Sequence, residues 1–334
     1  MSAITGSEIE AVLRDHGLLE TGSDVIVTPL AGGVSSEIWK VEAGGRTFCV
    51  KQALERLKVE ADWYAPLERN VYEARWNDVA NRVAPGTAPR VRCRDDERMF
   101  FIMDYLDPLT YELWKSRLLA GRAHTGDAAN VGRTLCRIHS ATAGDPEVSA
   151  RFPGTDIFHA IRLEPYLLAT AIRHPDLAAR LEALSLRTSQ TRKAMIHGDV
   201  SPKNILIGPT RPVLLDAECA CIGDPAFDLA FCLNHMLLKC LARPPAALLY
   251  LDCFDALCAA YLQGVDWEEP AALEERATAL LPALFLARVD GKSPVEYITT
   301  NTDRDKVRRC ARRLIQDPPS GLGEIALSWR EELR

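Results

Sequence analysis

The 334-residue chain lacks several features that would assign a protein to a special class at once. Its ten cysteines include no Cys-x-x-Cys pair, and several lie in apolar runs, as Cys232 and Cys253 do. Reduced, buried cysteines of cytoplasmic proteins are distributed in this way, so we expect neither disulfides nor a zinc site. No apolar run reaches the ~20 residues that a membrane-spanning helix needs. The first sixteen residues lack the basic segment and apolar core of a signal peptide. These absences predict a soluble, cytoplasmic protein.

The chain also lacks an excess of positive charge. Its formal net charge is −6, so it has no overall attraction to nucleic acid or to an anionic membrane. A local basic run at residues 308–313 has helical spacing and predicts a solvated helix face. A composition of 47% hydrophobic and 26% charged residues is typical of a globular protein. The length allows about two domains at ~150 residues each. We expect neither nucleic acid nor membrane as a partner, and the sequence leaves the oligomeric state open.

The first third of the chain alternates short apolar runs with glycine-rich turns. A helix is expected within residues 1–16, with Ser7 as its N-cap, and a longer one over residues 67–83. The Gly44-Gly45 pair between two apolar runs is a strong hairpin signal. Strands are expected at residues 24–30, 37–42, 46–51, 90–93 and 99–103.

Beyond residue 105 the pattern becomes mainly helical. The motif segment 195–216 interrupts these helices, and Pro282 should kink or restart the helix that contains it. The sequence therefore predicts two domains, residues 1–104 and 105–334, in an α+β fold with a small, mostly β first part. The helices are expected at residues 111–119, 128–141, 158–171, 177–184, 228–241, 246–263, 270–289 and 304–315.

The segment from Met195 to Leu206 carries the clearest chemical pattern. It contains Asp199 within His-Gly-Asp, Asn204 five residues later, and Asp216 after a short apolar run. Phosphoryl transfer on a kinase scaffold uses these three groups: a carboxylate that orients a substrate hydroxyl, and an amide and a carboxylate that hold Mg²⁺. Hard oxygen ligands of this kind suit Mg²⁺. We predict Asp199 as the catalytic base and Asn204 and Asp216 as metal ligands.

Three further polar residues near this segment have structural interpretations. His197 is expected to bond through its ring nitrogens to nearby backbone rather than to act as a base. Asp224 and Asp228, in the run Gly-Asp-Pro-Ala-Phe-Asp, are expected to brace the catalytic loop or to cap the next helix.

The first part of the chain supplies candidate nucleotide contacts. Gly32 and Gly33 lie between two expected strands, where backbone N–H groups can approach a polyphosphate, and the hydroxyl of Ser35 can join them. Lys51 ends the next apolar strand, and a buried lysine there requires an anionic partner. Nucleotide phosphates can supply one, and Glu73 on the following helix can supply another.

Together these segments resemble the aminoglycoside phosphotransferase and choline kinase superfamily, a branch of the protein-kinase-like fold. The resemblance covers nearly the whole chain, and its most specific part is the His-Gly-Asp loop with the downstream aspartate. It implies a two-lobed fold, ATP bound in the cleft with Asp104 and Tyr105 in the hinge, and phosphorylation of a small molecule's hydroxyl. A protein kinase fits less well, because eight residues between Asp216 and Pro225 leave no room for a long activation segment.

Within that superfamily the N-terminal part is most similar to methylthioribose kinases. The similarity lies in Val50-Lys51-Gln52-Ala53-Leu54, in Tyr72-Glu73-Ala74-Arg75 and in Asp216-Ala217-Glu218. It implies that Glu218 and Arg288 contact the acceptor together with Asp199. Two departures stand against methylthioribose itself. Ser201-Pro202-Lys203-Asn204 replaces the His-Thr-Gly-Ser of those kinases, and Arg288 stands alone where they carry two arginines.

The leading hypothesis is an ATP- and Mg²⁺-dependent kinase for a sugar or sugar-like alcohol. An antibiotic or amino-alcohol phosphotransferase is the alternative within the class, and it would use an acid-rich pocket for a cationic acceptor. A nucleotide-binding pseudokinase is the alternative outside it, but its expected mark, loss of Lys51, Asp199, Asn204 or Asp216, is absent. Acids available for a cationic acceptor are Asp252, Asp255, Asp266, Glu268 and Glu269, which on helices usually face solvent.

Overall fold

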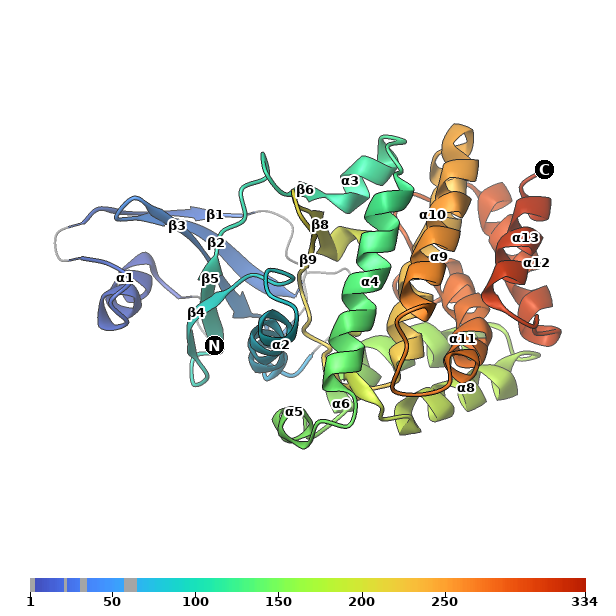
Figure 1. Ribbon diagram of the computed structural model, residues 1–334, viewed down its shortest axis with the longest axis horizontal. Coiled ribbons are helices and arrows are strands. Elements are labelled where there is room, and N and C mark those ends of the chain that lie inside the picture. Colours follow the sequence, from blue (N-terminus) through green and yellow to red (C-terminus); the bar gives the residue numbers. More distant parts are fainter. Residues whose placement is uncertain (1–3, 21–22, 31–34, 57–64) are drawn as a thin grey trace. The chain divides into compact units, whose positions relative to one another are not determined.

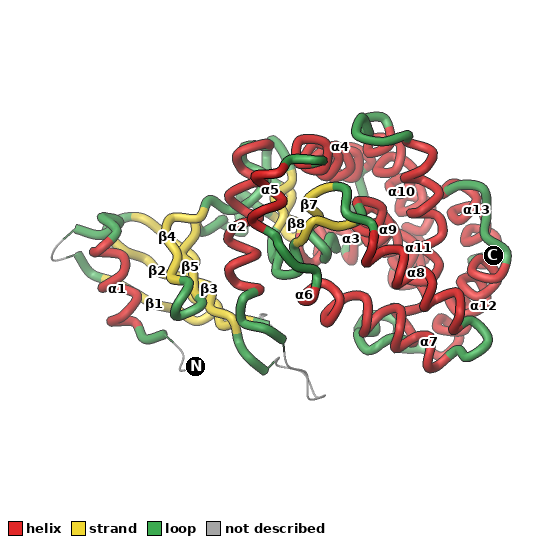
Figure 2. Tube along the Cα trace, turned by 90° about the horizontal axis from the view of Figure 1, so that it is seen from below, coloured by secondary structure: helices red, strands yellow, loops and turns green. Residues whose placement is uncertain are grey.

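The computed structural model describes residues 4–20, 23–30, 35–56 and 65–334. The chain divides into two compact units, Met1–Asp107 (unit 1) and Pro108–Arg334 (unit 2), where the sequence placed a boundary between residues 104 and 105. A five-stranded sheet with helices packed on it makes up unit 1, whereas helices dominate unit 2 (Figure 2). This combination confirms the expected α+β class.

Unit 1 is built on one antiparallel sheet in the order β1-β2-β3-β5-β4 (Figure 1). Gly44 and Gly45 both have positive φ, at 56° and 73°, and form the tight turn between β2 and β3. Glycine adopts two such conformations in succession at no steric cost, which explains the strong sequence signal. The strands are β1 (Val25–Pro29), β2 (Ser36–Ala43), β3 (Arg46–Ala53), β4 (Val91–Asp95) and β5 (Phe100–Asp104).

The first helix, α1 (Gly6–Asp15), begins at a different residue from the one predicted. Thr5, not Ser7, is the N-cap: its side chain accepts the N–H of Glu8, and the Glu8 carboxylate accepts the N–H of Thr5 at 2.8 Å. This reciprocal capping box satisfies two donors at once. Ser7 lies inside the first turn.

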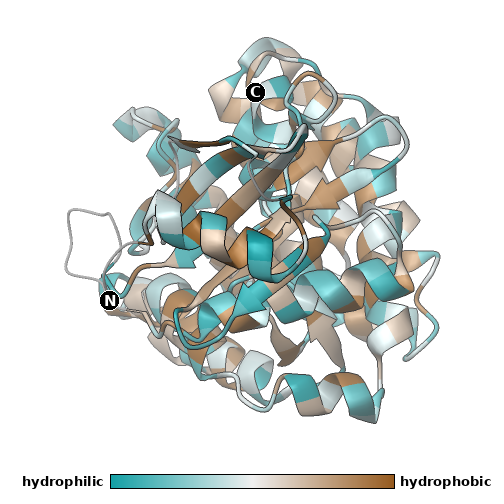
Figure 3. Cartoon of the chain, turned by 90° about the vertical axis from the view of Figure 1, so that its left-hand side faces the viewer, coloured by the Kyte–Doolittle hydropathy of each residue, from teal (hydrophilic) through white to brown (hydrophobic). Residues whose placement is uncertain are grey.

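The two helices of unit 1 cover opposite faces of the sheet. Phe48 and Val50 of β3 share a buried cluster with Ile9 of α1. Successive strand residues point to opposite faces. Lys51 therefore points away from α1, toward α2 (Arg69–Val83), where its carbonyl accepts a hydrogen bond from Asn70. Figure 3 shows apolar segments along the strands and mixed polar and apolar turns along the helices.

Unit 2 is a helical assembly with short strands at its motif segment. Two helices, α5 and α13, were not predicted. Of the kink or restart expected at Pro282, the restart does not occur: α11 continues through the proline, with buried residues on both sides of it. The helices are α3 (Trp114–Leu119), α4 (Thr125–Thr142), α5 (Pro146–Arg151), α6 (Asp156–Phe158), the π-helix η1 (His159–Leu168), α7 (Ala169–Arg173), α8 (Ala178–Gln190), the 3₁₀ turns η2 (Pro202–Asn204) and η3 (Pro244–Ala246), α9 (Pro225–Ala242), α10 (Ala247–Leu262), α11 (Pro270–Asp290), α12 (Asn301–Gln316) and α13 (Leu322–Glu332). The strands are β6 (Glu112–Leu113), β7 (Ala194–Ile196), β8 (Ile205–Ile207), β9 (Pro212–Leu214) and β10 (Cys221–Gly223).

The closest helix contact in this unit depends on one glycine. Helices α4 and α10 lie side by side (Figure 1), and a Cβ built on Gly132 would come within 2.4 Å of the Leu257 carbonyl oxygen. The segment Pro244–Leu262, which contains α10, is long and apolar enough to cross a membrane, contrary to the expectation that no segment would be, and 44% of it is buried. Its Tyr250, Phe254 and Leu257 are fully buried, as in a core helix.

Candidate active site

The loop that contains Asp199 is fixed by a carboxylate from a distant helix. Asp228 of α9 accepts the backbone N–H groups of His197 at 2.7 Å and Gly198 at 2.8 Å. Its second neighbour is His139, whose Nε2 lies 3.2 Å from the carboxylate and whose Nδ1 lies 2.7 Å from the Tyr261 hydroxyl. Asp224 accepts the N–H of Ala226 at 3.0 Å and caps α9. Both predictions for these aspartates, loop brace and helix cap, are confirmed.

Gly198 is required by its conformation and by its surroundings. Its φ is +77°, and a Cβ there would lie 2.7 Å from the Cβ of Cys219. Both observations exclude larger side chains unless the loop moves. The glycine therefore allows the loop to turn sharply after β7 and to present Asp199.

His197 holds the backbone on both sides of the site, as predicted. Its Nε2 lies 2.9 Å from the Leu215 carbonyl oxygen, and its Nδ1 accepts the N–H of Asp199 at 3.1 Å. Burial keeps the pKa of His197 below its ordinary value, although the neighbouring carboxylates of Asp228 and Asp199 oppose that shift. The neutral ring therefore connects the Asp199 loop to the residue that precedes Asp216.

The carboxylate of Asp199 is buried and contacts two cations. Arg162 of the π-helix lies 2.7 Å from it, and Lys203 lies 3.2 Å from it. Arg162 also donates from Nε to the Gly198 carbonyl at 2.7 Å. Burial alone would raise the pKa of Asp199, but Arg162 and Lys203 outweigh that effect and hold the pKa below its usual value. Asp199 is therefore ionised, precisely held and weakly basic.

Arg162 was missed by sequence reasoning. It lies between Ile161 and Leu163 in a helical run that reads as core, and no spacing connects it to the His-Gly-Asp loop. One signal was present: a charged residue within an apolar helix needs a buried partner. The π-helical turn is the less common helix geometry found often at functional sites.

Asn204 and Asp216 lie at the same end of a short hairpin. Ile205 of β8 pairs with Leu214 of β9, and the N–H of Leu215 donates to the Asn204 carbonyl at 2.8 Å. The Asn204 amide donates from Nδ2 to the Asp199 carbonyl at 3.1 Å, which leaves its Oδ1 as the acceptor end. Asp216 has φ +67°, a rare conformation for a non-glycine residue that often marks functional sites.

These donors fit a magnesium ion. An amide oxygen and a carboxylate oxygen are ligands that Mg²⁺ accepts, and Mg²⁺ keeps waters or substrate phosphates in its remaining positions. Within the described ranges no three His, Cys, Asp or Glu side chains cluster as a metal cage would require. The arrangement therefore suits an ion held partly by a ligand rather than a structural metal.

Unit 1 contains the predicted pair of Lys51 and Glu73. Lys51 Nζ lies 2.6 Å from Glu73 Oε2, and both side chains are buried. This confirms Glu73 as the anionic partner of Lys51. Ser35 is buried, and its carbonyl accepts hydrogen bonds from the Leu54 N–H at 3.0 Å and from the Arg69 guanidinium. The predicted contacts Gly32 and Gly33 lie outside the described residues.

The predicted hinge residues are engaged by their own unit. The Asp104 carboxylate accepts two hydrogen bonds from Arg92, at 2.6 and 2.8 Å. The N–H of Tyr105 donates to the Thr47 carbonyl at 3.4 Å, and Lys40 Nζ lies 5.5 Å from the centre of its ring. These contacts fix the end of β5. They do not test nucleotide binding by Asp104 and Tyr105, which stays a prediction.

The two predicted acceptor residues are both buried in unit 2. Glu218 follows Asp216 by two positions and, with Asp199, acts electrostatically on Arg162. Arg288 donates from Nη1 to the Tyr166 hydroxyl at 2.8 Å and to Ser293 Oγ at 3.2 Å. Asp290 pairs with Arg308 and His174 rather than with Arg288.

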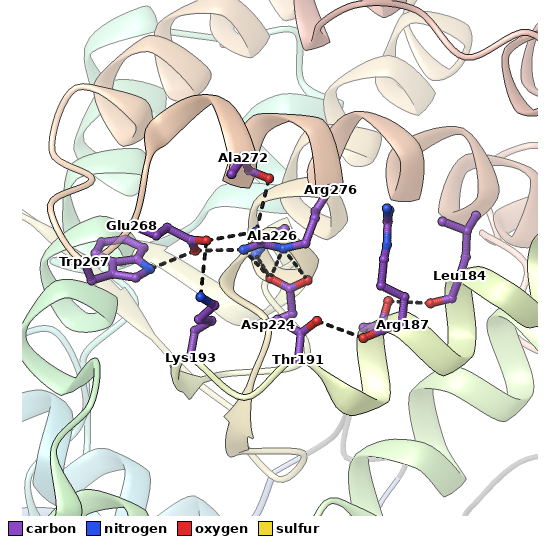
Figure 4. Close-up of polar contacts among 11 residues, drawn as sticks. Leu184, Arg187, Thr191, Lys193, Asp224, Ala226, Trp267, Glu268, Ala272 and Arg276 are labelled. Carbon is purple, nitrogen blue, oxygen red and sulfur yellow. Dashed lines mark hydrogen bonds and ion pairs between the residues drawn. The ribbon is translucent and has the colours of Figure 1, made fainter.

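A buried charge network supports the strands under this site (Figure 4). Arg276 of α11 contacts Asp224 at 3.0 Å and Glu268 at 2.7 Å. Glu268 also accepts a hydrogen bond from the Trp267 ring nitrogen at 3.1 Å. The expectation that Glu268 faces solvent is therefore wrong: it pairs with the arginine that holds the cap of α9. Of the acids considered for a cationic acceptor, this one is already neutralised.

Comparisons with known proteins agree with this geometry. A sequence profile described as the phosphotransferase enzyme family matches residues 26–273. Methylthioribose kinase of Bacillus cereus strain G9842 is 24% identical over 272 residues, which cover 71% of this chain and 67% of that protein.

Two solved structures share the fold. A choline/ethanolamine kinase family protein from Mesorhizobium loti has a TM-score of 0.55 at 16% identity and covers 97% of this chain and 99% of its own. Amicoumacin kinase in complex with AMP-PNP, Ca²⁺ and Ami has a TM-score of 0.55 at 13% identity, with 97% and 99% coverage. At these identities the likeness concerns the fold alone. The profile, however, spans most of the chain, and with the methylthioribose kinase match it decides the class. The chain belongs to the phosphotransferase enzyme family and is a phosphotransferase that acts on a hydroxyl group of a small molecule.

Proposed function

We propose that the protein transfers the γ-phosphoryl group of ATP, in the presence of Mg²⁺, to a hydroxyl of a sugar or sugar-like alcohol. One observation carries the proposal: Asn204 and Asp216 end the same hairpin, and Asn204 bonds directly to the backbone of Asp199. The similarity to methylthioribose kinase supports a sugar-like acceptor. The AMP-PNP and Ca²⁺ in amicoumacin kinase support a nucleotide with a divalent cation.

In the proposed reaction the acceptor hydroxyl donates a hydrogen bond to the Asp199 carboxylate. Its oxygen forms a bond to the γ-phosphorus, the bond from that phosphorus to the β–γ bridging oxygen breaks, and ADP leaves. The hydroxyl proton passes to Asp199 and then to solvent. Because Arg162 and Lys203 keep Asp199 weakly basic, it takes the proton late and acts mainly by orientation. A loose phosphoryl-transfer transition state requires no stronger base.

The remaining residues would hold the nucleotide. When bound, Mg²⁺ would neutralise phosphate charge, and Asn204 and Asp216 would offer it oxygen ligands. Lys51 would contact the nucleotide phosphates, and Glu73 at 2.6 Å holds its ammonium in place. The retention of all four of Lys51, Asp199, Asn204 and Asp216 favours an enzyme over a pseudokinase.

The test is an ADP-release screen with MgATP over pentoses, thiopentoses, amino sugars, choline and aminoglycosides. With the acceptor found, Asp199→Asn should retain nucleotide binding and lower turnover by about 10²–10⁴-fold, the usual range for a positioned acid or base. Asp216→Ala should instead weaken Mg²⁺-dependent nucleotide binding. Phosphorylation of choline or an aminoglycoside alone would move the acceptor to the amino-alcohol or antibiotic alternative. A folded protein that gains no thermal stability from millimolar MgATP would refute the proposal.

A further inference from the structure

Unit 2 contains a group of buried basic side chains, on α9 and α11, which the reaction above does not use. Lys239 of α9 is 1% exposed, and its Nζ lies 3.6 Å from the centre of the Tyr297 ring. In the part of the chain that the structure describes, no carboxylate lies within ion-pair distance of this ammonium. Arg288 of α11 is 8% exposed, and it donates only to neutral acceptors, the Tyr166 hydroxyl and Ser293. We name Lys239, Arg288 and His235 the basic cluster.

The basic cluster has little negative charge near it. Glu296 is the acid that acts on Lys239, and it already forms an ion pair with Lys115 of α3. Burial lowers the pKa of Lys239 to about 7 despite Glu296, and Lys115 and Arg288 add to that shift. Burial, followed by the charges of Arg288 and Lys239, also holds the pKa of His235 well below its ordinary value. A basic side chain buried without a matching anion either loses its proton or costs several kcal/mol, so three of them on two packed helices need an explanation.

The basic cluster and Tyr297, whose ring lies against Lys239, also hold polar atoms that no described residue satisfies. His235 Nε2, Arg288 Nε and Tyr297 Oη are buried and have no hydrogen-bond partner in the described ranges. More than nine-tenths of buried polar groups in folded proteins find a partner, so three exceptions in one place need an explanation. A ligand with several acceptor oxygens would satisfy donors on these side chains together.

Tyr166 connects the basic cluster to Asp199 within the same unit. Its hydroxyl accepts from Arg288, and the same π-helix η1 carries Arg162, four positions earlier, whose guanidinium lies 2.7 Å from Asp199. Its ring is 5.4 Å from that of Phe231, which is 5.6 Å from the ring of His235. One aromatic wall therefore extends from the neighbourhood of the catalytic carboxylate to the basic cluster.

Resting on the proposed phosphoryl transfer, we propose that the acceptor alcohol carries an anionic group, a carboxylate or a phosphate, that binds Lys239, Arg288 and His235 while its hydroxyl lies at Asp199. The oxygens of such a group accept from the guanidinium and the ammonium, which are the common protein partners of carboxylates and phosphates. The anionic group of the acceptor is not altered by the reaction. Only the acceptor O–H bond and the bond from the γ-phosphorus to the β–γ bridging oxygen break. Binding of an anionic group by the basic cluster favours an acidic acceptor over a polycationic antibiotic.

Sulfate is a probe that does not depend on knowing the acceptor. The full chain is titrated calorimetrically with sulfate in saturating MgADP, so that the nucleotide occupies its own phosphate contacts. Wild type should bind sulfate saturably, and Lys239→Met should weaken binding at least about tenfold. Lys292→Met is the matched control, because Lys292 is half exposed and pairs with Glu164 in the same unit. It should bind sulfate as wild type does. Absence of saturable binding in wild type, or equal binding in both variants, would overturn the inference.

Paired acceptors separate the two anionic groups and separate this inference from the proposed function. Turnover with MgATP is compared for glycerate and glycerol, glycerol 3-phosphate and glycerol, and ribose 5-phosphate and ribose. A preference of at least about tenfold for one acid, lost in Lys239→Met, supports the inference and identifies carboxylate or phosphate. If each neutral alcohol reacts as fast as its anionic counterpart, the inference is refuted, whereas the proposed kinase function stands. Sulfate binding without any MgATP binding or turnover refutes the kinase instead, and where no pair reacts the sulfate titration decides.

Discussion

Two buried lysines, one in each unit, have opposite electrostatic surroundings. Lys51 in β3 contacts the carboxylate of Glu73 at 2.6 Å, and both side chains are at most 5% exposed. Lys239 in α9 is as deeply buried, yet its near neighbour is the Tyr297 ring at 3.6 Å. The ammonium of Lys51 therefore has its counter-ion beside it in the core. The pKa of the second lysine is lowered further by the charges of Lys115 and Arg288, and Glu296, the acid that opposes this shift, pairs with Lys115.

The difference indicates two ways of using a buried cation. A paired lysine keeps its charge without a ligand, so it is fixed in place before a nucleotide arrives. An unpaired lysine is costly in the free protein and gains a partner only when an anion binds. The first arrangement favours a permanent positioning role, and the second favours selection of a charged acceptor. Substitutions of equal shape can separate the two.

The largest expected effect is the difference in unfolding free energy between removing the Lys51 ammonium and removing the Lys239 ammonium. Lys51→Met removes the 2.6 Å partner of the buried Glu73 carboxylate and should lower the unfolding free energy by about 3–5 kcal/mol. Lys239→Met should leave that free energy unchanged or raise it. Urea denaturation at pH 7 measures both. The double variant Lys51→Met/Glu73→Leu should recover most of the loss. If Lys239→Met were as damaging as Lys51→Met, the contrast between the two lysines would be wrong.

Unit 2 also contains a cation that, like Lys51, is paired with acids in the interior: Arg276. This guanidinium contacts Asp224 and Glu268, so Arg276→Met leaves two largely buried acids without their common partner. We expect a loss of about 3 kcal/mol in unfolding free energy. The control is Arg309→Met, because Arg309 is mostly exposed and its pair with Glu332 should contribute less than about 1 kcal/mol. Similar losses in the two variants would show that burial does not govern these pairs.

The smallest effect is a pH dependence specific to Lys239. Its pKa is about 7 in the folded protein, with Glu296, Lys115, Arg288, His235 and Tyr297 facing it, and about 10.4 in an unfolded chain. Between these values the unfolded chain binds the extra proton, so stability rises with pH from about 7 to 10 and is flat below about 6.

Relative to Lys239→Met, wild type should gain about 1.4 kcal/mol between pH 6 and pH 8, one pKa unit's worth of free energy. Melting curves of both proteins at the two pH values measure this difference. Saturating sulfate should reduce it, because a bound anion stabilises the ammonium. A gain that is absent, or of opposite sign, would show that Lys239 stays charged in the fold and has a partner.

Local patterns were the most predictable part of the molecule. The Gly44-Gly45 hairpin, the Asp224 cap and the roles of His197 and Asp228 all follow from residues whose types are required by the backbone near them. Errors occurred where several similar residues competed, as at the N-cap of α1, where Thr5 rather than Ser7 completes a capping box with Glu8. Of the kink or restart predicted at Pro282, the restart does not occur, and α11 continues through the proline among buried neighbours.

The sequence by itself determined the chemical class, because Asp199, Asn204 and Asp216 lie on one short loop and hairpin whose spacing is set by local geometry. Only the tertiary structure decided which cations act on that site. Arg162 reaches Gly198 and Asp199 from a helix that precedes them by 36 positions or more, and the charge of Arg288 on α11 lowers the pKa of Lys239 on α9. The physical reason is that turns and caps are satisfied by neighbours in the chain, whereas a buried charge is governed by whatever the fold places within a few ångströms of it.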